Sequence, residues 1–177
     1  VSDSAVYTFT VTASVSLTAR FEKDEETQPE SVFTDVKPTD WYADAVAYAV
    51  ENGLFAGTSP TTFAPNATMT RGMLVTVLYR QAGEPAVSNH NKFSDVSADT
   101  WYACPVTWAY NNGIVTGTGE KTFSPNEPVS REQLATILYR YTVAKGESAP
   151  LSGDLGVFTD AARISDWAED GVTWAVG

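Results

Sequence analysis

Residues 33–80 read FTDVKPTDWYADAVAYAVENGLFAGTSPTTFAPNATMTRGMLVTVLYR, and residues 93–140 repeat this stretch without a gap. The two copies lie 60 residues apart and are identical at 22 of 48 positions. A third copy opens with Phe158-Thr159-Asp160, gains one residue, and stops at Gly177 before its second half. A repeat of this length indicates one supersecondary unit that is copied and packed against its neighbours.

Each full copy is predicted to fold as a helix, a long structured loop and a second helix. In the first copy, Val46, Ala49 and Val50 place an apolar stripe on one helix face. The second helix begins at Thr70 or Ser130, because both residues are good N-caps. The loop carries Gly-Thr and then Phe-x-Pro-Asn, whose glycine and proline favour a compact turn. The repeats therefore predict a mainly α fold of tandem helix-loop-helix units.

The other segments are expected to precede or connect these repeats. Residues 1–23 alternate β-branched with small polar residues, which is typical of strand, so they resemble the tail of a preceding β module. The acidic residues 24–32 are predicted to be a linker. We place the repeats at 33–83, 93–146 and 158–177, the last of them incomplete.

Composition narrows the classes of function. The formal net charge of -11 and the isoelectric point near 4.3 argue against binding to nucleic acid or to an anionic membrane surface. A single Cys104 and a single His90 exclude a disulfide scaffold and a Cys/His metal cluster. No run of eighteen apolar residues is present, so membrane insertion is not expected.

Arg71 and Arg131 directly follow the two predicted N-caps. Helix N-termini carry unpaired backbone N–H groups and the positive end of the dipole, so a lone cation there is unfavourable. An anion held by the N–H groups and the guanidinium would explain the placement. The alternative is a structural ion pair with Asp35 or Asp95, and the sequence leaves both explanations open.

Aromatic pairs open the first helix of each full copy. Trp41, Trp101 and Trp167 recur at equivalent positions, and Tyr42 and Tyr102 follow the first two. Such side chains offer flat faces to sugar rings, although filling the core is their commoner role. We expect most of each tryptophan to be buried and the tyrosines to be more exposed.

Other repeated charged residues are interpreted as structural. Asp35, Asp95 and Asp160 each follow Phe-Thr or Phe-Ser, so an Asx-type cap that orders the entry to the first helix is favoured over ligand contact. Arg80 and Arg140 lie at the C-termini of the second helices, where a positive charge complements the dipole.

The repeated pattern favours binding over catalysis. An enzyme places unlike residues at one site, whereas here every candidate polar residue is duplicated, which is typical of multivalent binding. Paired carboxylates such as Asp35 and Asp95 serve glycoside hydrolysis in other proteins, but nothing in their spacing supports that reaction here. We therefore expect no catalytic residues, no cofactor and no metal site.

The ordered motifs of the two copies resemble the S-layer homology domain family over residues 33–177. They are Phe-Thr-Asp-Val-x4-Trp-Tyr-x3-Val, Asn-Gly-x3-Gly, Phe-x-Pro and Thr-Arg-x2-Leu-x3-Leu-Tyr-Arg. The resemblance implies three tandem repeats in a pseudo-threefold helical domain at one end of a secreted protein. It further implies grooves between repeats that bind secondary cell-wall polymers carrying ketal-linked pyruvate on a Gram-positive-type envelope.

The family's Thr-Arg-Ala-Glu motif falls on residues 70–73 and 130–133, where the arginine is kept and the next pair differs. The third copy lacks this motif, so at most two complete sites are expected. The ligand-binding residues that the resemblance and the repeats imply are Arg71, Arg131, Trp41, Tyr42, Trp101, Tyr102, Asp35, Asp95 and the loop glycines Gly57 and Gly117.

Two hypotheses follow. The first is a non-catalytic, extracellular module that binds pyruvylated cell-wall polysaccharide. The second is a structural or adhesive surface domain that makes homotypic or lattice contacts without binding glycan. Alanine at both Arg71 and Arg131 separates them, because glycan retention needs the arginines and lattice contacts do not. A glycosidase is the third and weakest alternative.

Overall fold

The computed structural model describes residues 32–87 and 92–177. Within these residues the chain is mainly helical and its only β pairing consists of isolated bridges, so the predicted fold class is confirmed. The β segment predicted at 1–23 and nearly all of the linker lie outside the described residues. The elements are α1 (Ala43–Glu51), α2 (Arg71–Gln81), α3 (Ala103–Asn111), α4 (Arg131–Ala144), α5 (Glu169–Ala175) and the short 3-10 helices η1 (Leu155–Val157), η2 (Ala161–Arg163) and η3 (Asp166–Ala168).

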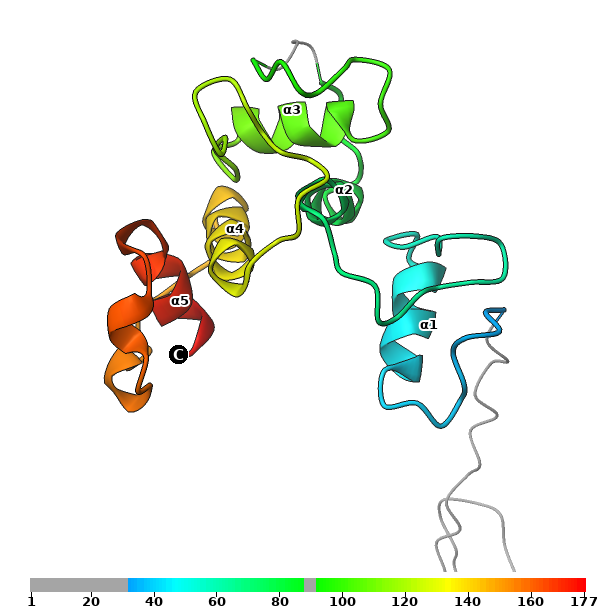
Figure 1. The fold of residues 1–177 in the computed structure, drawn as a ribbon, viewed down its shortest axis with the longest axis horizontal. Helices are drawn as coiled ribbons and strands as arrows, with labels where there is room; N and C mark the ends of the chain where they lie inside the picture. The colour runs from blue at the N-terminus through cyan, green and yellow to red at the C-terminus, as the bar shows by residue number, and fades with distance from the viewer. Residues whose placement is uncertain (1–31, 88–91) are drawn as a thin grey trace, which may run out of the picture.

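The second helix of each repeat packs against the first helix of the next repeat. α2 packs against α3, and α4 packs against α5. In Figure 1, α2 and α4 are seen nearly end-on, α3 lies above them, and α1 and α5 lie on opposite sides. Among the described helices, α1 has no comparably extensive partner. The packing unit is therefore shifted by half a repeat from the unit of sequence.

The main core lies where α2, α3 and α4 meet. At its centre, Trp108 of α3 makes edge contacts with Tyr79 of α2 and Tyr141 of α4, with ring centroids 5.6 Å and 6.2 Å away. The equivalent residue on α1, Tyr48, is 64% exposed, because no helix covers that face in the described part of the chain. α1 instead belongs to a smaller cluster with Phe33 and Val36.

The predicted helix starts are confirmed by their capping hydrogen bonds. The Thr70 hydroxyl accepts from the Met73 N–H at 3.3 Å. Ser130 and Gln133 form a capping box, in which the Ser130 hydroxyl accepts from the Gln133 N–H and the Gln133 side chain accepts from the Ser130 N–H. Pro105 is the third residue of α3, within the first turn, where its missing N–H has no intrahelical partner.

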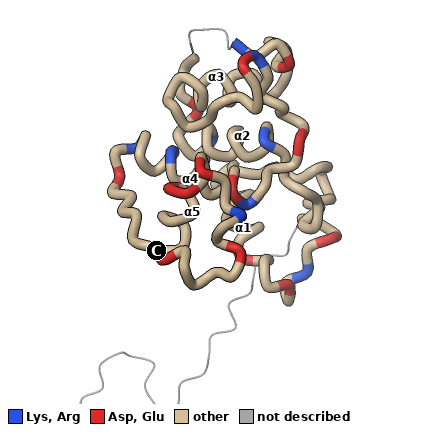
Figure 2. Tube along the Cα trace, turned by 60° about the vertical axis from the view of Figure 1, so that its left-hand side comes forward, with Lys and Arg blue, Asp and Glu red and all other residues tan. Residues whose placement is uncertain are grey.

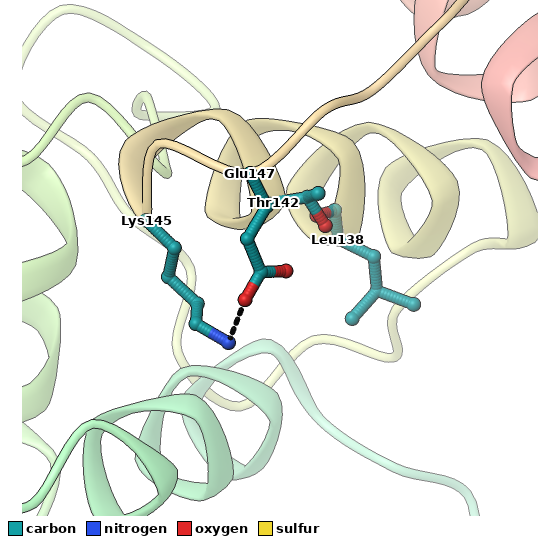
Figure 3. A network of polar contacts seen from close by, with 4 residues as sticks. All are labelled: Leu138, Thr142, Lys145 and Glu147. Atoms are coloured by element: carbon teal, nitrogen blue, oxygen red, sulfur yellow. Dashed lines mark hydrogen bonds and ion pairs between the residues drawn. The ribbon is translucent and has the colours of Figure 1, made fainter.

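Polar contacts close the C-terminal end of α4 (Figure 3). Thr142 donates its hydroxyl to the Leu138 carbonyl at 3.0 Å, and the Glu147 N–H donates to the Thr142 carbonyl at 3.2 Å. Lys145 and Glu147 form an ion pair of 2.6 Å, and this hydrogen bond raises the pKa of Lys145. Because the pair is exposed, it adds little to the stability of the fold.

A glycine allows the third copy to close against the second. A Cβ added at Gly171 would lie 2.5 Å from Thr136 Cα and 2.7 Å from Thr136 N. The backbones of α5 and α4 therefore approach more closely than any side chain at residue 171 would permit. Trp174 of α5 completes the contact on Tyr139, with ring centroids 6.0 Å apart.

Candidate ligand-binding grooves

Two grooves, related by the 60-residue repeat, lie between consecutive copies. Each combines the loop after the first helix of a repeat, one face of its second helix, and the tryptophan that opens the next copy. Groove 1 is lined by Leu54, Phe55, Ala56, Gly57, Thr58, Phe63, Ala64, Pro65, Ala67, Thr68, Met69, Met73, Thr76, Val77, Arg80 and Trp101. Groove 2 is lined by Arg71, Val115, Thr116, Gly117, Thr118, Gln133, Thr136, Ile137, Arg140 and Trp167.

Arg71 comes from the first repeat but lies in the groove of the second. The residue is 5% exposed. Its Nε donates to the Phe123 carbonyl at 2.9 Å and its Nη2 to the Thr116 carbonyl at 3.3 Å, while the guanidinium lies 4.6 Å from the Phe123 ring centroid. Burial lowers the pKa of Arg71, and the charge of Asp95 opposes that shift. The predicted structural ion pair is not formed through hydrogen bonds, since those of Arg71 go to carbonyls rather than to a carboxylate.

The N-terminus of α2 is already occupied by the second repeat. The Arg71 N–H donates to the Glu127 carbonyl at 3.0 Å, and the Gly72 N–H to the Pro125 carbonyl at 2.8 Å. With the Met73 N–H held by the Thr70 hydroxyl, the first three N–H groups of this helix are paired. The free N–H groups expected to hold an anion at this helix are therefore not available.

Arg131 has a different environment from Arg71, although the two are equivalent in sequence. It is exposed and makes no hydrogen bond or ion pair within the described residues, and it lines neither groove. Its neighbour Glu132 accepts hydrogen bonds from the N–H and hydroxyl of Ser165, at 2.9 Å and 3.1 Å. Arg71 reaches a loop of the following repeat, whereas Arg131 makes no equivalent contact within the described residues.

Asp35 and Asp95 hold the loops that form the floors of the grooves. The Asp35 carboxylate accepts from the N–H groups of Phe63 at 2.9 Å and Ala64 at 2.7 Å, and Asp95 accepts equivalently from residues 123–124. The hydrogen bond from Phe63 lowers the pKa of Asp35. The second residue of each pair has a positive φ, 62° and 59°. These carboxylates thus order a loop about 28 residues away rather than the helix entry that we expected.

The exposure expected for the aromatic pairs is wrong. Trp41, Trp101 and Trp167 are 93%, 59% and 52% exposed, whereas Tyr102 is buried and Tyr42 is partly buried. The tyrosine that precedes each helix points into the repeat, and the adjacent tryptophan points outward. Trp101 and Trp167 therefore lie at the edges of grooves 1 and 2, while Trp41 lines neither groove.

The loop glycines are required by close packing. A Cβ at Gly57 would lie 2.6 Å from the Phe33 ring, and a Cβ at Gly117 would lie 2.9 Å from the Phe93 ring. Gly57 also has a φ of +75°. The predicted glycine positions thus bring a loop directly over the first aromatic residue of each repeat.

Sequence reasoning missed that residues of three copies meet in one groove. Groove 2 joins Arg71 from the first copy, Gln133 and Arg140 from the second, and Trp167 from the third. The period showed which positions are equivalent, but no sequence signal indicated which copies come together. Among the described residues, no group of His, Cys, Asp or Glu side chains is placed to hold a metal ion, and no helix has the length and apolar character needed to cross a membrane.

Comparison with known proteins identifies the same two full copies. The family described as S-layer homology domain matches residues 32–72 and 92–135, one match in each full copy. The chain belongs to the S-layer homology domain family.

Relatives carry this S-layer homology segment as a minor part of their length. The chain is 34% identical over 79% of its length to an endoglucanase of Bacillus sp. (strain KSM-635), and covers 15% of that protein. It is 32% identical over 75% of its length to a surface-layer 125 kDa protein of Lysinibacillus sphaericus, covering 11%. It is 28% identical over 77% of its length to a cellulosome-anchoring protein of Acetivibrio thermocellus, covering 30%. The matched segment thus occurs both in enzymes and in surface proteins, and it makes up less than a third of the length of each of these relatives.

Proposed function

We propose that this S-layer homology chain is a non-catalytic, extracellular module that anchors a larger protein to the cell wall by binding an anionic polysaccharide in its grooves. The ligand class we favour is a secondary cell-wall polymer that carries ketal-linked pyruvate. The observation that carries the proposal is groove 2, where two arginines and an exposed tryptophan surround one cavity.

The chemistry of groove 2 suits an acidic sugar. Arg71 and Arg140 line it, and no carboxylate is among its lining residues. Acidic residues are spread over the rest of the chain, as Figure 2 shows, and the net charge is -11. A polyanion is therefore repelled by most of the surface and attracted locally. Trp167 offers a flat apolar face on which a sugar ring can stack.

The relatives support the same assignment. One is named a surface-layer protein and another a cellulosome-anchoring protein, and both share this segment with enzymes whose names describe glycan hydrolysis. A module common to proteins of such different activities supplies attachment more readily than catalysis. Within this proposal Gly57, Gly117 and the two aspartates shape the loops of the grooves, and Trp101 offers a flat face at the edge of groove 1. Tyr42 and Tyr102 point into their repeats and are structural.

The deciding experiment is calorimetric titration of the chain with purified secondary cell-wall polymer, before and after mild acid removal of its pyruvate. We expect binding to the native polymer and its loss with the pyruvate. Equal binding to both preparations would refute the anionic recognition. Binding to neither would refute the anchoring function.

A lattice or adhesive function is the second candidate, and it is favoured by the open side of α1. Trp41, which lies just before α1, is 93% exposed, and Tyr48 on α1 is 64% exposed. Under this alternative the chain self-associates without polymer, and Trp41→Ser together with Tyr48→Ser reduces the association. Sedimentation velocity over a range of protein concentrations tests it, since a monomer at every concentration excludes homotypic contact.

A further inference from the structure

We propose that the two grooves have different ligands: groove 2 binds the anionic group, and Arg140 is the side chain that contacts it directly. Groove 1 accepts only uncharged parts of the polymer. This inference rests on the proposed function and specifies which groove and which arginine perform it. Sequence pattern alone assigned Arg140 to the helix dipole, as it did Arg80.

Arg80 and Arg140 occupy equivalent positions but differ in their hydrogen bonds. Arg80 in groove 1 donates Nη1 to the Leu54 carbonyl at 3.0 Å, a bond that ties α2 to its own loop. Arg140 is partly buried and makes no hydrogen bond or ion pair within the described residues. A planar guanidinium has five N–H donors, which match a carboxylate in a two-pronged geometry. The N–H donors of Arg140 therefore lie at the wall of groove 2 without a partner among the described residues.

The surroundings of Arg140 make groove 2 the more polar of the two. Gln133 and Thr116 stand where groove 1 has Met73 and Ala56. Arg71 adds a second positive charge, and no equivalent arginine lines groove 1. Neither groove is lined by an acidic residue, and groove 2 is lined by two arginines whereas groove 1 is lined by one. Both positive charges attract an anion to this groove.

The two arginines of groove 2 have different roles. Arg71 is a positioning residue, since its hydrogen bonds to the carbonyls of Phe123 and Thr116 hold the loop that forms one wall. It contributes charge to the groove without having to leave these bonds. Arg140 lies on α4, which is fixed by its contacts with α5, so its guanidinium starts from a rigid backbone. Arg140 is therefore the arginine that contacts the anionic group directly.

A pair of small probes tests the groove assignment in the full chain. The first is a methyl hexopyranoside with a ketal-linked pyruvate, and the second is its methyl ester, which keeps the shape and removes the charge. The indole N–H signals of Trp167 and Trp101 report grooves 2 and 1 separately, after assignment by substituting each tryptophan with phenylalanine. We expect the acid to shift the Trp167 signal and the ester to leave it unchanged.

Affinity measurements on variants test the assignment of Arg140. Arg140→Gln should weaken binding of the acid about tenfold or more, because it removes charge-assisted hydrogen bonds. Arg140→Lys should retain part of the affinity. Arg80→Gln, the matched change in groove 1, should change it less than about twofold. Urea unfolding checks that each variant is folded. If Arg80→Gln does not fold, Met73→Ala serves as the groove 1 variant instead.

Each other outcome is decisive. An acid probe that shifts Trp101 instead of Trp167, or equal losses from Arg140→Gln and the groove 1 variant, would overturn this inference while polymer binding upheld the proposed function. Unchanged affinity in Arg140→Gln would do the same. Failure of the unsubstituted chain to bind both polymer and probe would overturn the proposed function itself.

Discussion

Replacing Arg71 by methionine should destabilise the chain strongly, while the same change at Arg131 should not. The buried, charge-assisted hydrogen bond to the Phe123 carbonyl, at 2.9 Å, contributes about 2 kcal/mol. The longer bond to Thr116 and the contact with the Phe123 ring together add about 1 kcal/mol. Methionine recovers most of the apolar packing but leaves both carbonyls without this donor. We therefore expect a loss of about 3 kcal/mol in the free energy of unfolding.

Urea unfolding followed by tryptophan fluorescence measures this loss. With a denaturant slope of about 2 kcal/mol per molar urea, the midpoint of Arg71→Met should fall by about 1.5 M. Arg131 is exposed and makes no hydrogen bond within the described residues, so Arg131→Met should stay within about 0.5 kcal/mol of the unsubstituted chain. Equal midpoints for the two variants would refute the reasoning, because they would mean that the desolvation of Arg71 cancels its hydrogen bonds.

Three further changes test other parts of the fold. Because the pKa of Asp35 is lowered in the folded chain, its ionised carboxylate stabilises the fold above the unfolded pKa of about 4. This stability should be lost on acidification, and the loss should be smaller in Asp35→Asn. Thermal unfolding between pH 7 and pH 3 measures both. Gly171→Ala should cost about 1–3 kcal/mol in urea unfolding because its Cβ would overlap the backbone of α4, whereas Gly119→Ala, with ordinary contacts, should be nearly neutral. Trp108→Ala should cost about 3–5 kcal/mol and Trp41→Ala almost nothing, and similar midpoints would contradict the burial difference between them.

Local features of the fold were readable from the sequence because they depend on residues close together in the chain. The hydroxyls of Thr70 and Ser130 cap the helices that follow them, as their sequence positions predicted. Tryptophan exposure was not readable. Trp101 and Tyr102 are adjacent and both aromatic, and only the direction in which each leaves the backbone separates a groove edge from the core.

The candidate site was predicted in part. Arg71 was identified from its position after an N-cap, but its partners are carbonyls of Thr116 and Phe123, 45 and 52 residues further along the chain. Arg140 was interpreted as a dipole partner because its sequence context is the same as that of Arg80. The difference between these two arginines, and hence between the grooves, depends on a hydrogen bond to Leu54 that no local pattern encodes.

The sequence by itself determined the repeat, the helical class and the family, because a 60-residue period records equivalent local structure in each copy. The tertiary structure decided how the copies fit together. The second helix of one repeat packs on the first helix of the next, so each groove is formed by residues of different copies. For the same reason Arg71 of the first repeat lies against a loop of the second repeat. Equivalent residues thereby acquire unequal surroundings, since burial and hydrogen bonding depend on contacts across copies, which periodicity alone does not specify.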